Sequence, residues 1–272
     1  MNRLTRILHI AFLSGAALAF SAAVSRAQSG PFTNSLGMKF VPIPGTNILM
    51  CTTDTTVEQY KAVGMVSWLT YWGSSFRQGP THPEVDVSWN EAQAWCRSLS
   101  NKEGKKYRLP TDGEWSAAVG PGLYPWGSQW PPPNNCGNYA GQELRTISQA
   151  DAEKFFAKGF NLIKGFSDHH PFTSPVGSYP ANRYGLYDMG GNVSEWCEDE
   201  YRARMNSAEA IKAFPALKDE KMPDGTRLRV LRGGSWCDSQ DLLLRSSFRG
   251  RNHPALRVIS GGFRCVVVVS GG

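Results

Sequence analysis

The sequence predicts a single compact α+β domain with little regular secondary structure. Glycine and proline are abundant, with 28 and 17 copies among 272 residues, which favours many turns. The chain also contains 9 tryptophans, 9 tyrosines and 13 phenylalanines, whereas disordered chains are poor in aromatic residues. Helical and strand patterns are short and alternate with aperiodic blocks of Gly, Asn, Asp and Trp. Because no internal repeat or interdomain linker interrupts them, we expect one loop-rich domain with an aromatic core.

Short strands are expected first. Residues 38–43 and 48–50 are mostly apolar and are separated by a turn at Pro44 and Gly45. Pro42 and Pro44 lack the backbone N–H that the interior of a sheet requires. This segment is therefore predicted to lie at a sheet edge.

Three capping boxes predict where helices begin. In a capping box, a Ser or Thr is followed three residues later by Glu, and each side chain accepts a hydrogen bond from a free backbone N–H. Such pairs begin at Thr55, Ser88 and Thr111. The box at Ser88 begins the longest expected helix, which Gly104 ends. Its apolar positions recur at helical spacing and predict one buried face: Ala92, Trp95, Cys96 and Leu99.

Patterns in the second half of the chain are weaker. Residues 148–158 predict a short helix, and residues 203–222 predict a polar surface insertion with a weak helix. Residues 227–232 alternate apolar and charged side chains with period two, which predicts a strand. The apolar run in residues 262–269 predicts one closing strand.

The N-terminus has the pattern of an export signal. Arg3 and Arg6 precede a stretch of apolar and small residues over 7–24, and Ala27 is a suitable cleavage site. We predict that residues 1–27 are removed and that the mature protein is periplasmic or secreted, with no stable membrane span. The alternative is an uncleaved anchor, because about 18 apolar residues can just cross a bilayer.

The charge balance argues against nucleic acid as a partner. The formal net charge is +6, but three arginines and no acidic residue fall within the first 27 residues, so the exported chain would carry +3. That charge is small for the length of the chain, and no basic cluster is visible along it.

Six cysteines follow the signal, at positions 51, 96, 136, 197, 237 and 265. An even number in an oxidising compartment favours disulfides, and six cysteines allow fifteen pairings among which spacing alone does not choose. Free buried thiols are the alternative. No Cys-x-x-Cys pair occurs, so neither a thiolate zinc site nor a thioredoxin-like redox site is predicted.

Eight sequence blocks identify a family. They are Asn-Ser-Leu-Gly-Met-Lys-Phe-Val at 34–41, Val-Ser-Trp-Asn-Glu-Ala at 87–92, Tyr-Arg-Leu-Pro-Thr at 107–111 with Glu-Trp at 114–115, Tyr-Pro-Trp-Gly at 124–127, Pro-Val-Gly-Ser at 175–178, the run at 182–196, Arg-Gly-Gly-Ser-Trp at 232–236 and Gly-Phe-Arg at 262–264. In this order, over about residues 33–268, they resemble the formylglycine-generating enzyme (sulfatase-modifying factor) family. The resemblance implies that residues 33–270 form the family's domain, with a fold related to C-type lectins.

The resemblance also implies structural calcium, a hard cation that binds oxygen ligands in tight turns. One expected site takes side-chain oxygens from Asp188 and Glu195 and carbonyl oxygens from Gly191 and Val193. A second expected site combines the side chains of Asn138 and Asp168 with the carbonyls of Tyr139 and His170. The alternative for both is a turn held by Asx hydrogen bonds without a metal.

Disulfide pairing is another expectation from the family, which joins a helix cysteine to the cysteine after Gly-Phe-Arg. Here these residues are Cys96 and Cys265. Cys197 and Cys237 each follow a tryptophan and are candidates for a second pair. Cys51 and Cys136 would then remain as the third pair.

The oxidases of this family bind copper(I) through two cysteines that follow the Gly-Gly-Ser-aromatic motif, because soft thiolates suit that ion. The corresponding positions here are Asp238 and Leu243, and Cys237 lies one residue early. Copper is therefore not expected. No catalytic residue is assigned, and Ser235, Cys237 and Asp238 are the candidates for lining the equivalent groove.

Two functions follow from these expectations. The first is a calcium-stabilised binding module for a protein, peptide or glycan. The alternative is an oxidoreductase of the formylglycine-generating type that acts on an exported protein or peptide through different metal ligands.

Overall fold

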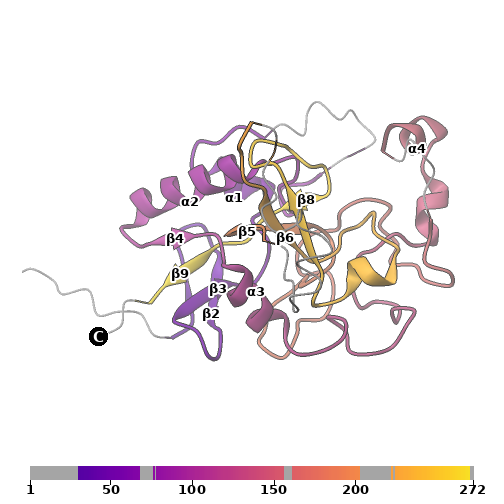
Figure 1. Ribbon diagram of the computed structural model, residues 1–272, viewed down its shortest axis with the longest axis horizontal. Helices are drawn as coiled ribbons and strands as arrows, with labels where there is room; N and C mark the ends of the chain where they lie inside the picture. Colours follow the sequence, from indigo (N-terminus) through magenta and orange to yellow (C-terminus); the bar gives the residue numbers. More distant parts are fainter. Residues whose placement is uncertain are drawn as a thin grey trace, which may run out of the picture.

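The computed structural model describes residues 30–67, 76, 78–155, 161–202, 222 and 224–269. Short strands in these residues form two sheets (Figure 1). The first sheet is antiparallel and has the strand order β1 (Phe32–Thr33), β2 (Lys39–Pro42), β3 (Ile48–Cys51), β9 (Val266–Val268) and β4 (Tyr107–Arg108). The second sheet has the order β7 (Arg249–Asn252), β6 (Arg229–Arg232), β5 (Ser194–Glu200) and β8 (Gly261–Gly262), in which β8 pairs with β5 in parallel. The α+β architecture with little regular structure is thus confirmed.

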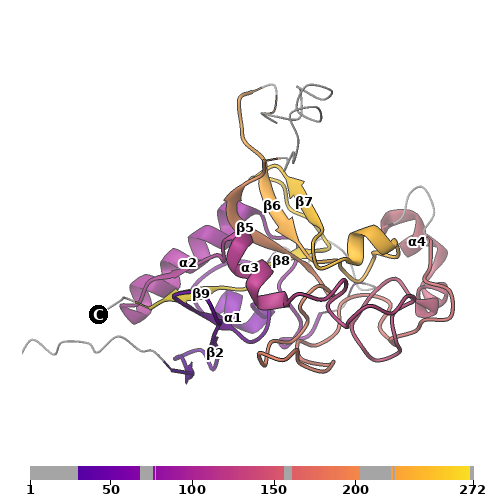
Figure 2. The ribbon, with the colours of Figure 1, turned by 60° about the horizontal axis from the view of Figure 1, so that its bottom comes forward.

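The described residues also form α-helices. They are α1 (Val57–Lys61), α2 (Trp89–Glu103), α3 (Asp112–Val119) and α4 (Gln149–Phe155). Helix α2 contacts β4, and its expected apolar face is buried in the largest core cluster. Both ribbon views place α4 at the end of the molecule away from α2 (Figures 1 and 2). Helix α4 confirms the helix expected in residues 148–158. Most of the predicted insertion at 203–222 lies outside the described residues.

Two of the three capping boxes form as predicted. Ser88 and Thr111 each cap a helix through a reciprocal pair with the Glu three residues later. The first capping box begins one residue later than predicted: Thr56 caps α1, and its partner is Gln59. Thr55 is fully buried, and its backbone N–H donates to Phe263 O at 2.9 Å. A glutamine side chain closes the box as well as a glutamate does.

The predicted closing strand is wrong in its continuity. Instead of one strand over 262–269, the chain forms β8 in the second sheet and β9 in the first, and Phe263–Cys265 crosses between them. The predicted edge position is wrong for β2 as a whole, which lies between β1 and β3, but Pro42 itself has a neighbouring strand on one side only. Proline is tolerated there because β1 pairs only with Lys39 and Phe40, so no strand requires its N–H.

Two glycine-rich segments cross at close range in the centre of the molecule. Gly234 N donates to Gly190 O at 3.1 Å, and Trp236 N donates to Asn192 O at 3.0 Å. Gly233 has φ of +78°, and a β-carbon on it would lie 2.9 Å from the α-carbon of Gly190. The crossing therefore requires glycine for its backbone conformation and for space.

Gly233→Ala is expected to lower the free energy of unfolding by about 3 kcal/mol, since left-handed strain and a backbone clash add. Gly104→Ala is the matched control, because Gly104 has φ of +66° and nothing lies within 4 Å of an added β-carbon. That change should cost about 1 kcal/mol. Urea unfolding measures both variants, and equal costs would contradict the close crossing.

Candidate functional site

A fully buried ion pair lies between the two sheets. Arg264 Nε is 2.7 Å from Glu195 Oε2, and Arg264 Nη2 is 2.9 Å from Glu195 Oε1. The indole N–H of Trp115 also donates to Glu195 Oε2, at 3.1 Å. Both residues of the pair have an exposed fraction of 0%. Glu195 is thus a structural carboxylate with a donor on each oxygen.

Asp54 adds a further carboxylate to this ion pair. Its Oδ1 lies 3.7 Å from Arg264 Nη2, and neither of its oxygens has a hydrogen-bond partner among the described residues. Burial raises the pKa of Asp54 well above its usual value, and the nearby Glu195 carboxylate raises it further. Sequence reasoning missed Asp54, Arg264 and this coupling. The only available signal was a charged residue within an otherwise apolar Gly-Phe-Arg-Cys run.

The first predicted calcium site forms in part. Asp188 Oδ2 accepts from Gly177 N at 2.7 Å, whereas its Oδ1 is buried and has no partner in the described part of the chain. Burial raises the pKa of Asp188 to about 6. Gly191 and Val193 lie in the turn that follows, where Val193 N donates to Gly191 O. The unpartnered Asp188 oxygen fits a cation, but Glu195 is already neutralised by an arginine.

The second predicted calcium site is brought together more completely. Asp168 accepts from Tyr139 N at 2.7 Å and from His170 N at 2.9 Å, so one carboxylate joins three of the expected residues. The fourth, Asn138, is fully buried, and its Oδ1 has no partner among the described residues. Burial raises the pKa of Asp168 to about 7. An orphaned amide oxygen beside a carboxylate is a donor set that fits calcium.

Glu143 was missed by sequence reasoning, although it supports this second site. Its carboxylate accepts from Gly141 N at 2.8 Å and from Asp168 N at 3.2 Å. No three His, Cys, Asp or Glu side chains within the described ranges are placed to hold a metal ion together. Coordination in either turn would therefore depend on amide and carbonyl oxygens as well.

The candidate groove residues do lie together. Ser235 Oγ donates to Asp238 Oδ2 at 2.7 Å, and Ser235 N donates to the same oxygen at 2.9 Å. Cys237 Sγ lies 3.3 Å from Ser235 Oγ. Burial raises the pKa of Cys237 to about 12, so its thiol stays protonated at neutral pH. The arrangement stabilises a turn and does not activate a nucleophile.

All six cysteines fall within the described residues, and each is free. The predicted bond between Cys96 and Cys265 is not formed, although both residues lie in the largest core cluster. Cys51 lies in that cluster too, and its N–H donates to Cys265 O at 3.0 Å. Cys197 and Cys237 pack against different clusters, so the structure does not bring this suggested pair together.

None of the helices that the structure describes is both long and apolar enough to cross a bilayer.

The buried carboxyl of Glu84, which lies outside the two predicted calcium sites, should make the stability of the fold depend on pH. It is 1% exposed, and burial raises its pKa from 4.5 to about 7. The folded state therefore holds this proton more tightly than the unfolded state does, and stability falls as pH rises from about 4.5 through about 7. Glu84→Gln should raise the free energy of unfolding by about 2 kcal/mol above this window and change it little below.

Urea unfolding at about pH 5 and about pH 8 tests this dependence. Glu58→Gln, which removes the same charge at an exposed position of α1, is the matched control. A uniform effect of Glu84→Gln at both pH values would contradict the assignment.

Comparison with known proteins identifies relatives. Residues 23–269 match the family described as sulfatase-modifying factor enzyme 1-like domain. The chain is 34% identical over 200 residues to the formylglycine-generating enzyme of Thermomonospora curvata, covering 71% of this chain and 58% of that protein. It is 35% identical over 202 residues to the inactive C-alpha-formylglycine-generating enzyme 2 of Bos taurus, covering 71% and 52%. The chain thus spans little more than half the length of these two relatives.

Solved structures share the fold. PvdO from Pseudomonas aeruginosa superposes with a TM-score of 0.56 at 20% identity, covering 88% of this chain and 97% of that one. Treponema denticola variable protein 1 superposes with a TM-score of 0.55 at 23% identity, covering 88% and 99%. At these identities the likeness concerns the fold alone.

Proposed function

Because this chain belongs to the sulfatase-modifying factor family, we propose that it is a calcium-stabilised binding module for a protein, peptide or glycan. The observation that carries this proposal is the change at the family's copper positions. By the resemblance, Asp238 and Leu243 stand at these two positions. The Asp238 carboxylate accepts hydrogen bonds from the backbone N–H and the hydroxyl of Ser235. Two thiolates are needed to hold copper(I) in the family's manner, and this segment has only the protonated thiol of Cys237.

Sequence identity does not decide between the two functions. The chain is about equally similar to a formylglycine-generating enzyme and to one whose name calls it inactive, at 34% and 35% identity. The decision therefore depends on the groove residues. An oxidoreductase using other metal ligands is the second candidate, and the cluster of Ser235, Cys237 and Asp238 is where those ligands would have to lie.

Calcium in this proposal is structural. The side chains of Asn138 and Asp168, with the carbonyls of Tyr139 and His170, would hold the ion. Its charge would offset the buried carboxylate and satisfy the orphaned amide oxygen. We also propose a weaker contribution from the bend at Asp188, whose Oδ1 has no partner among the described residues.

Calcium at about a hundred times its Kd should raise the free energy of unfolding by about 2.7 kcal/mol, and a chelator should reverse the gain. Asp168→Asn should remove most of this response and leave only the weaker contribution of the Asp188 bend. The response is measured as the difference with and without calcium so that lost hydrogen bonds cancel. Asp224→Asn is the control, because Asp224 is an exposed carboxylate in a turn. An unchanged calcium response in Asp168→Asn would sink the second site.

Metal analysis with thiol counting separates the two functions. The binding module predicts calcium and no copper in the purified protein. Stoichiometric copper that is lost in Cys237→Ser would instead establish the oxidoreductase. Oxidation of the purified protein should join Cys265 to Cys96, as in the family. Peptide mapping identifies the pair, and a bond between Cys265 and the adjacent Cys51 would contradict this expectation.

Export is also proposed, on the pattern of residues 1–27, which lie outside the described residues. Intact mass of the protein recovered from the periplasm or medium should correspond to a chain that begins at Gln28. A mature chain that retains residue 1 would contradict cleavage and favour the anchor.

A further inference from the structure

A cavity of about 260 Å³ lies at the C-terminal end of α3, apart from the predicted calcium turns and the candidate groove. Its polar lining consists of two arginines and three serines: Arg232, Arg249, Ser116, Ser246 and Ser247. The loop over 119–122 completes the wall. None of the predicted metal ligands or groove residues contributes to this lining.

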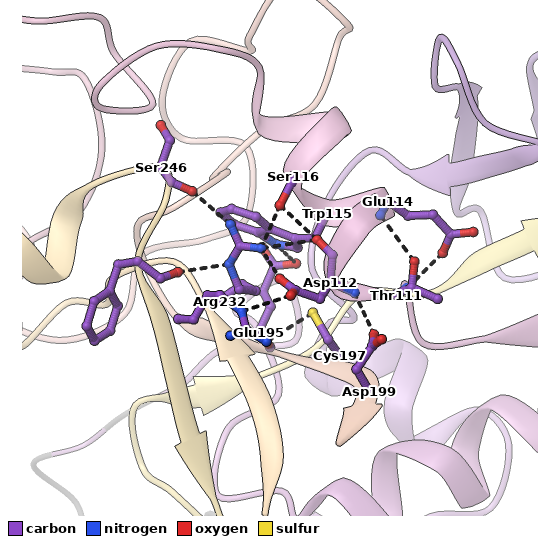
Figure 3. Close-up of polar contacts among 12 residues, drawn as sticks. Thr111, Asp112, Glu114, Trp115, Ser116, Glu195, Cys197, Asp199, Arg232 and Ser246 are labelled. Carbon is purple, nitrogen blue, oxygen red and sulfur yellow. Dashed lines mark hydrogen bonds and ion pairs between the residues drawn. The ribbon is translucent and has the colours of Figure 1, made fainter. Parts of the chain in front are cut away.

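The positive charges of this cavity come from its two arginines. Arg232 is 1% exposed, and its Nη1 pairs with Asp112 Oδ1 (Figure 3). Arg249 Nε pairs with the other oxygen of the same carboxylate, at 2.8 Å. Two guanidinium groups thus share the Asp112 carboxylate, and a second carboxylate, that of Asp199, accepts from Asp112 N at 2.6 Å.

Most hydrogen-bond donors of Arg232 are already used. Its Nε donates to Phe248 O, its Nη1 to Ser116 Oγ and its Nη2 to Ser246 O, each at 2.8 Å. Figure 3 shows the guanidinium fixed between Ser116 and Ser246 by these bonds. Arg232 therefore contributes a rigid wall and a fixed charge.

Two donors of the lining have no acceptor among the residues that the structure describes. Arg249 Nε and Nη1 donate to Asp112 and to Arg202 O, but no acceptor among the described residues lies on Nη2. Ser246 Oγ is buried and also has no partner in the described part of the chain. A buried hydroxyl without a partner is unfavourable, and a ligand that accepts from it would remove this cost.

We propose that this cavity binds a small oxyanion, a carboxylate or a phosphate, through Arg249 and the Ser246 hydroxyl. Guanidinium donors match the geometry of both groups, and a hydroxyl donates to either. The fixed charge of Arg232 would raise the affinity without a direct bond. The anion is either a free ion or a carboxylate at the end of a peptide, and the site is independent of the calcium turns.

Amide chemical shifts of Ser246 and Ser247 would report binding in separate titrations at constant ionic strength. The probes are inorganic phosphate, N-acetyl-trialanine as the free acid and the same peptide as the amide. Saturable shifts are expected with phosphate, the acid or both, and none with the amide. Tighter binding of the acid assigns the site to a peptide carboxylate, and tighter binding of phosphate assigns it to a phosphate ion.

Two variants test the residues. Ser246→Ala should weaken binding about fivefold, the usual effect of one hydrogen bond. The removed hydroxyl has no partner among the described residues. In the absence of an anion, this variant should therefore be at least as stable as the unmodified chain, and weaker binding would not reflect unfolding. Arg249→Gln should weaken binding about tenfold or more, since it removes a charged donor.

Arg245→Gln is the matched control, because Arg245 is a half-exposed arginine that pairs with Asp241 outside the cavity. It should bind the probes as the unmodified chain does. The proposal is overturned if neither phosphate nor the free acid gives saturable shifts. It is equally overturned if Ser246→Ala and Arg249→Gln both bind with unchanged affinity.

Discussion

The buried ion pair between Arg264 and Glu195 holds the two sheets to each other. Arg264 lies in the segment that crosses from β8 to β9, Glu195 belongs to β5, and Trp115 of α3 donates to the same carboxylate. Arg264 also donates to the carbonyls of Cys51 and Tyr187. The ion pair therefore joins both sheets, helix α3 and the Asp188 bend. Breaking a buried pair of this kind typically costs about 3–5 kcal/mol, because a buried charge is left uncompensated.

A second buried arginine repeats this arrangement. Arg232 of β6 pairs with Asp112 at the beginning of α3, and its guanidinium stacks 4.4 Å from the ring of Trp115. The two arginine networks thus meet at one tryptophan, which donates to Glu195. With so few long strands and helices, these polar networks fix the positions of loops that backbone ladders leave unsupported.

The residues that build this scaffold are separate from those that would perform the family's chemistry. The crossing of Gly190 with Gly233 and the arginine networks depend on the blocks that this chain retains. Asp238, which the family resemblance predicts to stand at a copper-ligand position, accepts hydrogen bonds from the backbone and the hydroxyl of Ser235. An aspartate in place of a cysteine at such a position would keep the turn while removing a soft metal ligand. Membership of the family therefore establishes the fold and leaves the reaction to be decided at the groove.

The sequence by itself determined the features that depend on local contacts. The caps at Ser88 and Thr111, the buried face of α2 and the strand β6 all involve residues a few positions apart, so periodicity and capping rules predict them. The sequence blocks also identified the family, and the resemblance then implied the residues of the Asn138 turn. Only the tertiary structure decided which buried charges meet: Arg264 and Glu195 are 69 positions apart, and Arg232 and Asp112 are 120 apart. The tertiary structure also divided the closing strand between two sheets and placed Cys51 beside Cys265. Packing across the core sets these contacts, and no local sequence pattern encodes it.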